Sequence, residues 1–294
     1  MDGTLARTAA PAEPGEPIAT HDVPGGGGLR LRVQEWGNRE KPPIVLIHGW
    51  SQSQLCWDRQ VHGRLAANFH IVTFDIRGHG MSDKPTDAEH YLDAQLWADD
   101  LAAVIERTNL DRPALVASSY GGFVVTDYVR AYGDERLSGI NLVGGTVMLR
   151  PPTFEHIGPG FLESADDACA PDLATNIAAI RRFVRALTAQ PLSSDDWSMA
   201  LCWHMVVPAE VRGALISREL DADDVLSDLS VPVLVTHGRS DAIVLPSMAE
   251  HVLDVCETAE PSWYEGVGHF PFIEDPVRFD RELGEFLAGV TADR

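Results

Sequence analysis

The stretch from Val116 to Phe123, "VASSYGGF", indicates the fold of this chain. Two serines precede paired glycines where a strand pattern gives way to a helix pattern. A serine on a sharp strand-to-helix turn needs small residues two positions before and two after it. Ser119 has Ala117 and Gly121 at those positions, whereas Ser118 is flanked there by a valine and a tyrosine. We therefore expect Ser119 to stand on such a turn. Alanine in place of the usual first glycine is a small departure, by one methyl group.

Strand and helix patterns alternate along the rest of the chain. Seven runs have the apolar or alternating pattern of strands: "LRLRVQEWG" from Leu29, "PIVLIHG" from Pro43, "FHIVTF" from Phe69, "ALVASS" from Ala114, "LSGINLVGG" from Leu137, "VPVLVTHG" from Val231 and "PSWYEGVGH" from Pro261. Alternation with helices predicts an α/β fold, a mostly parallel sheet with helices on both faces.

Two helices can be predicted from their apolar stripes. The first stripe consists of five residues at helical spacing: Leu92, Trp97, Leu101, Val104 and Ile105. The second lies near the end of the chain and contains Phe279, Leu283, Phe286 and Leu287. We expect Asp275 to cap this last helix, with Pro276 at its first position.

The sequence divides into a core and an insertion. Residues 148–229 carry helical patches without strand signals, which predicts a helical lid inserted before the strand at Val231. The core is expected to span residues 19–147 and 230–294. Residues 1–18 are rich in Pro, Ala and Glu and are expected to form a flexible leader.

Composition and charge narrow the class of partners. The 294 residues contain 23 Lys and Arg against 44 Asp and Glu, a formal net charge of −21. Such an acidic chain repels nucleic acid and anionic membranes, so we expect neither as a partner. Four separated cysteines without a CxxC pair predict free thiols rather than a metal site: Cys56, Cys169, Cys202 and Cys256. With no apolar signal-peptide core, a cytoplasmic protein is expected. The sequence does not indicate an oligomeric state.

Three polar residues follow predicted strands in the order Ser, Asp, His. Ligands of open α/β sheets bind beyond the carboxyl ends of the strands, and Ser119, Asp241 and His269 each stand at such an end. A serine hydroxyl needs a base with a pKa near neutrality, which histidine provides. We therefore predict that Ser119 is a nucleophile, His269 its base, and Asp241 the group that orients the imidazole.

A negatively charged reaction intermediate would need two backbone N–H donors. The N–H groups of Trp50, after "VLIHG", and of Tyr120, after the nucleophile, are predicted to supply them. Three further histidines are expected to be structural: His48, His79 and His237. We also expect Asp75 and Arg77 to pair and shape the loop between them.

Together these residues resemble the α/β-hydrolase superfamily. The matching stretches are "HGW" from His48, "FDIRGHGMSDKP" from Phe74, "ASSYGG" from Ala117, "VLVTHGRSDAIV" from Val233 and "GVGHFPFIEDP" from Gly266. The first two are most similar to esterases described as non-haem chloroperoxidases or perhydrolases, and to enol-lactone hydrolases. This resemblance implies the α/β-hydrolase fold with an eight-stranded sheet, no cofactor or metal, and cleavage of an ester or lactone through an acyl-enzyme.

Other activities of this superfamily stay open or are disfavoured. A carbon–carbon bond hydrolase keeps the same three residues. A cofactor-independent dioxygenase uses the histidine as a base, but its acid tends to follow the earlier strand, where Gly145 and Thr146 stand. Hydrogen peroxide in place of water would give a peracid as a side activity. Dehalogenases and epoxide hydrolases carry an aspartate at the position of Ser119, so both are disfavoured. A non-enzymatic receptor role is also disfavoured, because a receptor would not need the three residues.

The substrate is expected to be a small molecule, apolar or aromatic. The residues predicted to line its pocket are Trp50, Tyr120, Trp197, Trp203, Met205 and Phe270, with Phe161 as a further candidate. Packing within the lid itself is the alternative explanation for the lid aromatics.

Overall fold

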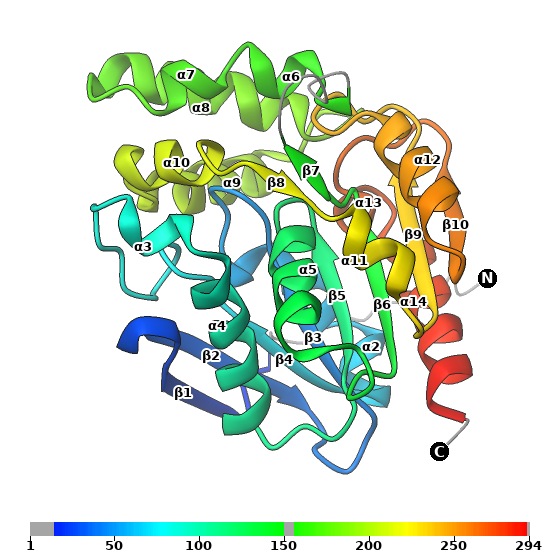
Figure 1. Cartoon of the computed structure of the whole chain (residues 1–294). Helices are drawn as coiled ribbons and strands as arrows, with labels where there is room; N and C mark the ends of the chain where they lie inside the picture. The colour runs from blue at the N-terminus through cyan, green and yellow to red at the C-terminus, as the bar shows by residue number, and fades with distance from the viewer. Residues whose placement is uncertain (1–14, 150–155, 293–294) are drawn as a thin grey trace, which may run out of the picture.

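A central eight-stranded sheet organises the chain, seen here in a computed structural model that describes residues 15–149 and 156–292 (Figure 1). In spatial order the strands are β1 (Ala19–Pro24), β2 (Arg30–Gly37), β4 (His70–Phe74), β3 (Pro43–Ile47), β5 (Ala114–Ser118), β6 (Gly139–Val143), β9 (Val233–Gly238) and β10 (Ala259–Tyr264). β2 is antiparallel to both of its neighbours, and the other pairs are parallel. The predicted mostly parallel sheet is confirmed.

Each predicted strand is present, although most are shorter at one or both ends. β1 was not predicted, because only Val23 of its six residues is buried and the run "ATHDVP" has no apolar pattern. Of the predicted leader 1–18, residues 1–14 lie outside the described residues. The N–H of Ile18 already donates to the carbonyl of Glu35, 2.8 Å away, at the start of this edge strand.

Helices cover both faces of the sheet (Figure 1). One face carries α4 (Ala94–Arg107), α5 (Gly121–Tyr132) and α12 (Pro246–Val255), and the other carries α2 (Arg64–Asn68) and α14 (Pro276–Ala292). Short elements complete the core: η1 (Gly26–Gly28), η2 (Gln54–Trp57), α1 (Asp58–Val61), α3 (Glu89–Leu92) and α13 (Pro271–Glu274).

The predicted helix stripes are correct except at one residue. Four of the five residues in the first stripe are buried on α4, but Leu92 belongs to α3 and is 50% exposed. The helical conformation is interrupted at Asp93, between the two helices. The side chain of Asp93 caps α4 by accepting the N–H of Gln95. The predicted cap of the last helix is confirmed, since Asp275 Oδ1 accepts the N–H of Arg278 at 3.3 Å.

The insertion between β6 and β9 is mostly helical. It contains α6 (Pro159–Leu162), α7 (Ala165–Ala168), α8 (Leu173–Ala186), α9 (Ser194–Val206), α10 (Ala209–Ile216) and α11 (Asp223–Asp228). It also contains one short strand pair, in which β7 (Met148–Leu149) is antiparallel to β8 (Leu220–Asp221). Strands of two residues are too short to produce a pattern in the sequence.

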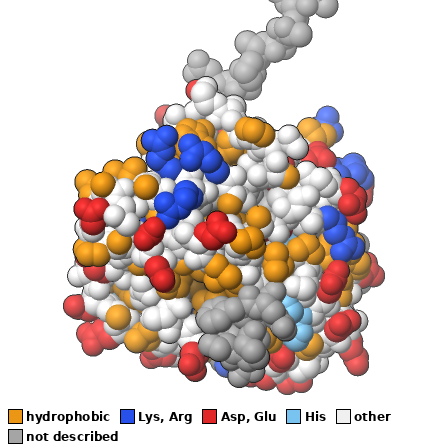
Figure 2. Space-filling view, turned by 90° about the horizontal axis from the view of Figure 1, so that it is seen from above, with side chains coloured by type: hydrophobic (Ala, Val, Ile, Leu, Met, Phe, Trp, Pro, Cys, Tyr) orange, Lys and Arg blue, Asp and Glu red, His pale blue; other side chains and the backbone are white. Residues whose placement is uncertain are grey.

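The insertion lies across one end of the sheet (Figure 1). Figure 2 views the molecule from that side, where Lys and Arg side chains gather among scattered acidic and hydrophobic ones. Among the described residues, no single helix is long and apolar enough to cross a membrane; α9 and α10 reach that length and composition only together, and an 83° bend separates them.

A buried carboxylate ties the edge strands to the body of the sheet. Glu35 on β2 is 2% exposed and accepts hydrogen bonds from His21 Nε2 (2.6 Å), His70 Nε2 (2.7 Å) and the guanidinium of Arg39 (2.8 Å). Burial alone would raise the pKa of Glu35, but the bonds from Arg39, His21 and His70 outweigh it and lower the pKa to about 2. The ionised form is therefore the stable one in the folded chain.

Replacing Glu35 with glutamine should lower the free energy of unfolding by about 2–3 kcal/mol at pH 7, because it leaves buried donors around a weaker acceptor. The stabilisation exists above the unfolded carboxyl pKa and disappears as the pH falls from about 4.5 towards 2. Urea denaturation at several pH values measures this, with Glu257→Gln on an exposed residue as the control. Equal stability of the Glu35 and Glu257 variants at pH 7 would contradict the expectation.

Candidate active site

Ser119 stands on a strained turn between β5 and α5, as the sequence predicts. Its φ is +53°, in the left-handed region that non-glycine residues rarely adopt. The turn is held by its own backbone: the Ser119 N–H donates to the carbonyl of Val143 (3.0 Å), and its carbonyl accepts from Gly122 (2.9 Å) and Thr146 (3.0 Å). A sharp strand-to-helix turn of this kind presents the side chain beyond the sheet edge.

The glycines that follow the serine are required by close packing. A Cβ on Gly121 would lie 2.9 Å from the Ile47 carbonyl oxygen, and one on Gly122 would lie 2.6 Å from that of Thr146. Ala117 lies earlier, within β5, where its methyl group is accommodated in the buried sheet. The alanine therefore leaves the turn at Ser119 intact.

Asp241 and His269 form a direct hydrogen bond, with 2.7 Å between Oδ2 and Nδ1. Asp241 follows β9 and His269 follows β10, and both are buried. Both His269 and Ser119 lie at the end of β6. A Cβ atom on Gly144, the residue that follows β6, would be 3.0 Å from His269 Nδ1. The N–H of Ser119 donates to the carbonyl of Val143, the last residue of β6. The structure thus gathers the three predicted residues at one edge of the sheet.

The carboxylate of Asp241 has further donors on both oxygens. Its Oδ1 accepts the N–H groups of Ile243 (2.8 Å) and Val244 (3.1 Å), while His237 Nε2 lies 3.3 Å from Oδ2. Burial would raise the pKa of Asp241, but His269 and His237 outweigh it and hold the pKa well below its ordinary value. Asp241 is therefore ionised beside the imidazole. His237 also contacts the carbonyl of Val244 (2.9 Å), in keeping with its predicted structural role.

Two histidines shape the loop that carries Trp50. His48 Nε2 accepts the N–H of Ile76 (3.1 Å), so its Nδ1 carries the proton that is donated to the Gly49 carbonyl (2.9 Å). Because a trans peptide directs its C=O and N–H oppositely, this bond turns the N–H of Trp50 away from His48. His79 Nε2 accepts the N–H of Ser51 at 3.0 Å.

Both rings are neutral, since burial lowers the pKa of His48 and of His79. Their structural role is as predicted. Within the described residues, the N–H groups of Trp50 and Tyr120 donate to no protein acceptor. A Cβ on Gly49 would lie only 2.8 Å from Ser119 Cβ, so the Trp50 loop passes directly beside the serine. Two donors are therefore available next to Ser119.

The predicted pair of Asp75 and Arg77 does not form. Arg77 pairs with Asp100 on α4, with 2.7 Å between Nε and Oδ2. Asp75 instead accepts the N–H groups of Gln54 and Met81, each at 2.8 Å. The loop is shaped as expected, but each side chain has a partner distant in sequence that the local pattern could not reveal.

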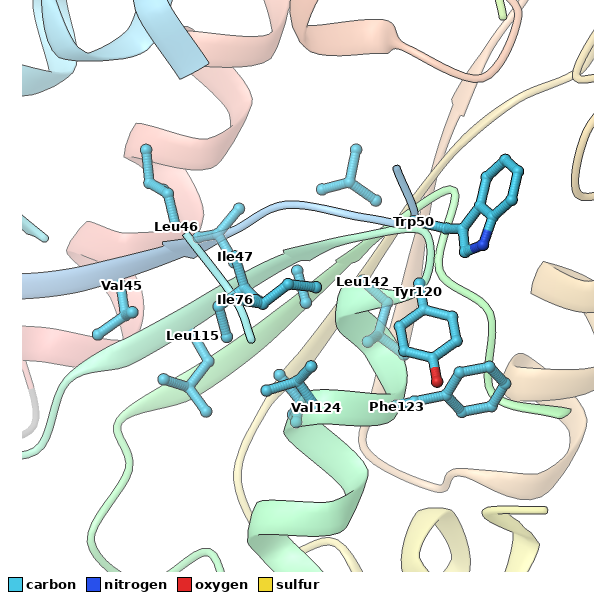
Figure 3. Packing of buried hydrophobic residues seen from close by; sticks show 14 of the residues in the cluster. Val45, Leu46, Ile47, Trp50, Ile76, Leu115, Tyr120, Phe123, Val124 and Leu142 are labelled. Atoms are coloured by element: carbon cyan, nitrogen blue, oxygen red, sulfur yellow. The ribbon is translucent and has the colours of Figure 1, made fainter. Parts of the chain in front are cut away.

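A small apolar cavity lies beside Ser119. Its volume is about 30 Å³, and it is lined by Trp50, Ser119, Tyr120, Phe123, Thr146, Leu149, Ile157, Phe161, Ile216, Ile243 and Val244. Figure 3 shows Trp50, Tyr120 and Phe123 side by side beyond the ends of the strands. The ring of Phe161 packs edge-on against Trp50, with 5.3 Å between the centroids. Residues of the insertion therefore form part of the cavity wall beside the serine.

Four of the predicted pocket residues lie elsewhere. Trp197 lines a separate hollow of about 450 Å³ and packs beneath Arg185, and Trp203 packs on His204. Met205 packs half-buried against the core. Phe270 is buried between the rings of His269 (5.4 Å) and Phe272 (5.1 Å). For the lid residues, packing within the insertion is therefore the better explanation. Helical spacing in the sequence could not distinguish a side chain that faces the core from one that faces the cavity.

The aliphatic wall of the cavity was missed by sequence analysis. Ile216 ends α10, while Ile243 and Val244 follow Asp241. Only the proximity of the last two to the predicted acid could have indicated them. In the described parts of the chain, no group of His, Cys, Asp or Glu is arranged to hold a metal ion, and the four cysteines are free thiols.

The fold and this arrangement define the class of protein. The sequence model of the alpha/beta hydrolase family matches residues 44–282, and the chain belongs to this family. It is similar to a non-heme chloroperoxidase from Streptomyces lividans, 30% identical over 88% of this chain and 96% of that protein. A bifunctional esterase/perhydrolase from Acinetobacter calcoaceticus is 28% identical over 74% of this chain and 80% of that protein.

Among solved structures, an esterase from Rhodococcus sp. ECU1013 has a TM-score of 0.88 and 33% identity over 93% of this chain and all of that one (100%). The resemblance to α/β hydrolases, and to chloroperoxidase-like and perhydrolase-like esterases among them, is confirmed.

Proposed function

We propose that this α/β hydrolase cleaves carboxylic esters through an acyl-enzyme formed on Ser119. The observation that carries the proposal is the buried 2.7 Å bond between His269 and Asp241 at the same sheet edge as the left-handed Ser119. The similarity to proteins named esterases supports the class of reaction.

In the proposed mechanism each group has one task. Asp241 accepts the Nδ1–H of His269, which leaves Nε2 free to take the proton of the serine hydroxyl. Ser119 Oγ then attacks the ester carbonyl, and the N–H groups of Trp50 and Tyr120 stabilise the resulting oxyanion. His269 returns the proton to the departing alcohol. Water, deprotonated by His269, finally attacks the acyl group and releases the acid.

The proposed substrate has a small, uncharged acyl group. The cavity of about 30 Å³ beside Ser119 is lined almost entirely by apolar side chains, which would leave a charged acyl group unpaired. A lactone presents the same carbonyl and is included in the proposal. Perhydrolysis is a second activity of the same site, favoured by the similarity to an esterase/perhydrolase, with hydrogen peroxide replacing water. The dioxygenase alternative would have its acid after β6, whereas Asp241 follows β9, and this difference disfavours that alternative.

Nitrophenyl esters of increasing acyl length test this proposal. We expect kcat/KM to be highest for acetate and to fall by about tenfold or more for long chains, because overfilling a packed site costs about 1–3 kcal/mol. Ile216→Ala should move the preference towards longer chains, since Ile216 lines the cavity. Ile177→Ala, on the exposed side of α8, is the matched control. Absence of turnover across the whole series would refute the proposal.

A further inference from the structure

The carboxylate of Glu274 joins two loops that are far apart in the sequence. Glu274 ends α13, and its Oε1 accepts the N–H of Gly268 at 2.7 Å. Its Oε2 accepts the N–H groups of Ala189 (2.8 Å) and Gln190 (3.3 Å). One loop carries His269 and the other follows α8 in the insertion, so a single side chain connects the core to the insertion beside the base.

The backbone makes the same connection independently of Glu274. The N–H of His269 donates to the carbonyl of Leu187 at 2.8 Å. The two loops are in such close contact that a Cβ on Gly268 would lie 2.7 Å from the nitrogen of Ala189 and 3.0 Å from Thr188. The insertion therefore forms the surface against which the loop of His269 is placed.

The loop of His269 is held on its other side by the loop of Asp241. The N–H of Ser240 donates to the carbonyl of Val267 at 2.9 Å, and Asp241 binds the imidazole. His269 is consequently fixed between the acid on one side and the insertion on the other.

We infer that Glu274 is a positioning residue, which uses the insertion as a support to hold His269 in line with Ser119 and Asp241. The inference rests on the proposed function, in which His269 moves the proton. A carboxylate that accepts three N–H groups has no replacement among uncharged side chains, since an amide offers only one acceptor atom. A displacement of about 1 Å in a catalytic group lowers rates by about 10².

Glu274→Gln should therefore lower kcat by about 10- to 100-fold and leave KM within about twofold, because the cavity is unchanged. The rate of labelling by a fluorophosphonate should fall in parallel, and the pH profile of kcat/KM should shift. Glu274→Asp, which keeps the charge but is shorter, should give intermediate values. It also provides a second variant if the glutamine variant folds poorly.

Glu282→Gln is the matched control. Glu282 lies on α14, is 22% exposed at its side chain, and accepts hydrogen bonds from Ser262 and Arg278 rather than from either loop. Its replacement should lower stability without changing kcat or the pH profile. An equal loss of kcat in the Glu274 and Glu282 variants would overturn the inference, because the effect would then reflect stability alone.

Hydrogen–deuterium exchange separates this inference from the proposed function. In Glu274→Gln the amides of Gly268, Ala189 and Gln190 should exchange faster than in the wild type, whatever substrate the enzyme uses. Unchanged exchange would show that Glu274 does not hold these loops and would overturn the inference. If the wild type cleaves no ester but exchange is faster in Glu274→Gln, the proposed function would be refuted, while the role of Glu274 in holding the two loops would be supported.

Discussion

Replacing Ser119 with alanine should lower the kcat of ester hydrolysis by about 10⁶-fold, the loss seen when a serine protease loses its nucleophile. The variant keeps the Trp50 and Tyr120 amides and the bond between His269 and Asp241, but no atom remains to form the acyl-enzyme. Alanine also adopts the left-handed conformation of this turn as poorly as serine does, so the backbone strain is unchanged.

A fluorophosphonate probe and mass spectrometry measure the same step directly. The wild type should carry the adduct on Ser119, and the alanine variant should carry none. Ser118→Ala is a close control, because the Ser118 hydroxyl is buried and has no hydrogen-bond partner among the described residues. It should retain near wild-type turnover. An adduct that persists in Ser119→Ala would place the nucleophile elsewhere.

Asp241→Asn should slow kcat by about 10⁴-fold while the chain remains folded. The amide oxygen can still accept the N–H groups of Ile243 and Val244, which keeps the loop in place. The amide nitrogen then faces His269 Nδ1 and donates to it. This forces the imidazole proton onto Nε2, where the base must accept the proton of Ser119.

Circular dichroism and steady-state kinetics test this prediction together. The pKa of Asp241 lies well below its ordinary value, so mild acidification of the wild type should leave this carboxylate ionised. Asp254→Asn, on the exposed side of α12, provides the control and should leave kcat unchanged. A loss of less than about tenfold in Asp241→Asn would mean that another group orients the imidazole.

The sheet and the three catalytic candidates could be predicted because their signals are local. A buried parallel strand is a short apolar run, and the residue that follows it in the chain also follows it in space. Ser119, Asp241 and His269 were found in this way. The cap at Asp275 joins residues within one helical turn, from Asp275 to Arg278, and could be predicted for the same reason.

Features that depend on long-range packing could not be predicted. Arg77 pairs with Asp100 on another element, and Asp75, an acidic side chain only two residues away from Arg77 in the sequence, has different partners. Trp197 and Ile216 both lie on helices of the insertion, yet only the isoleucine reaches the cavity beside Ser119. The rotation of a helix about its axis decides this, and α9 is apolar on several sides, so its sequence does not indicate which side faces the serine.

The hydrogen bond from the N–H of His269 to the Leu187 carbonyl has a consequence for protein engineering and for divergence within the family. Insertions are natural units to exchange between relatives when a new substrate range is wanted. Here a transplanted insertion would also have to present a carbonyl oxygen at the position of Leu187. Chimeras should therefore keep residues 187–190 with the host core, so that the recognition surface can be varied while the base stays aligned.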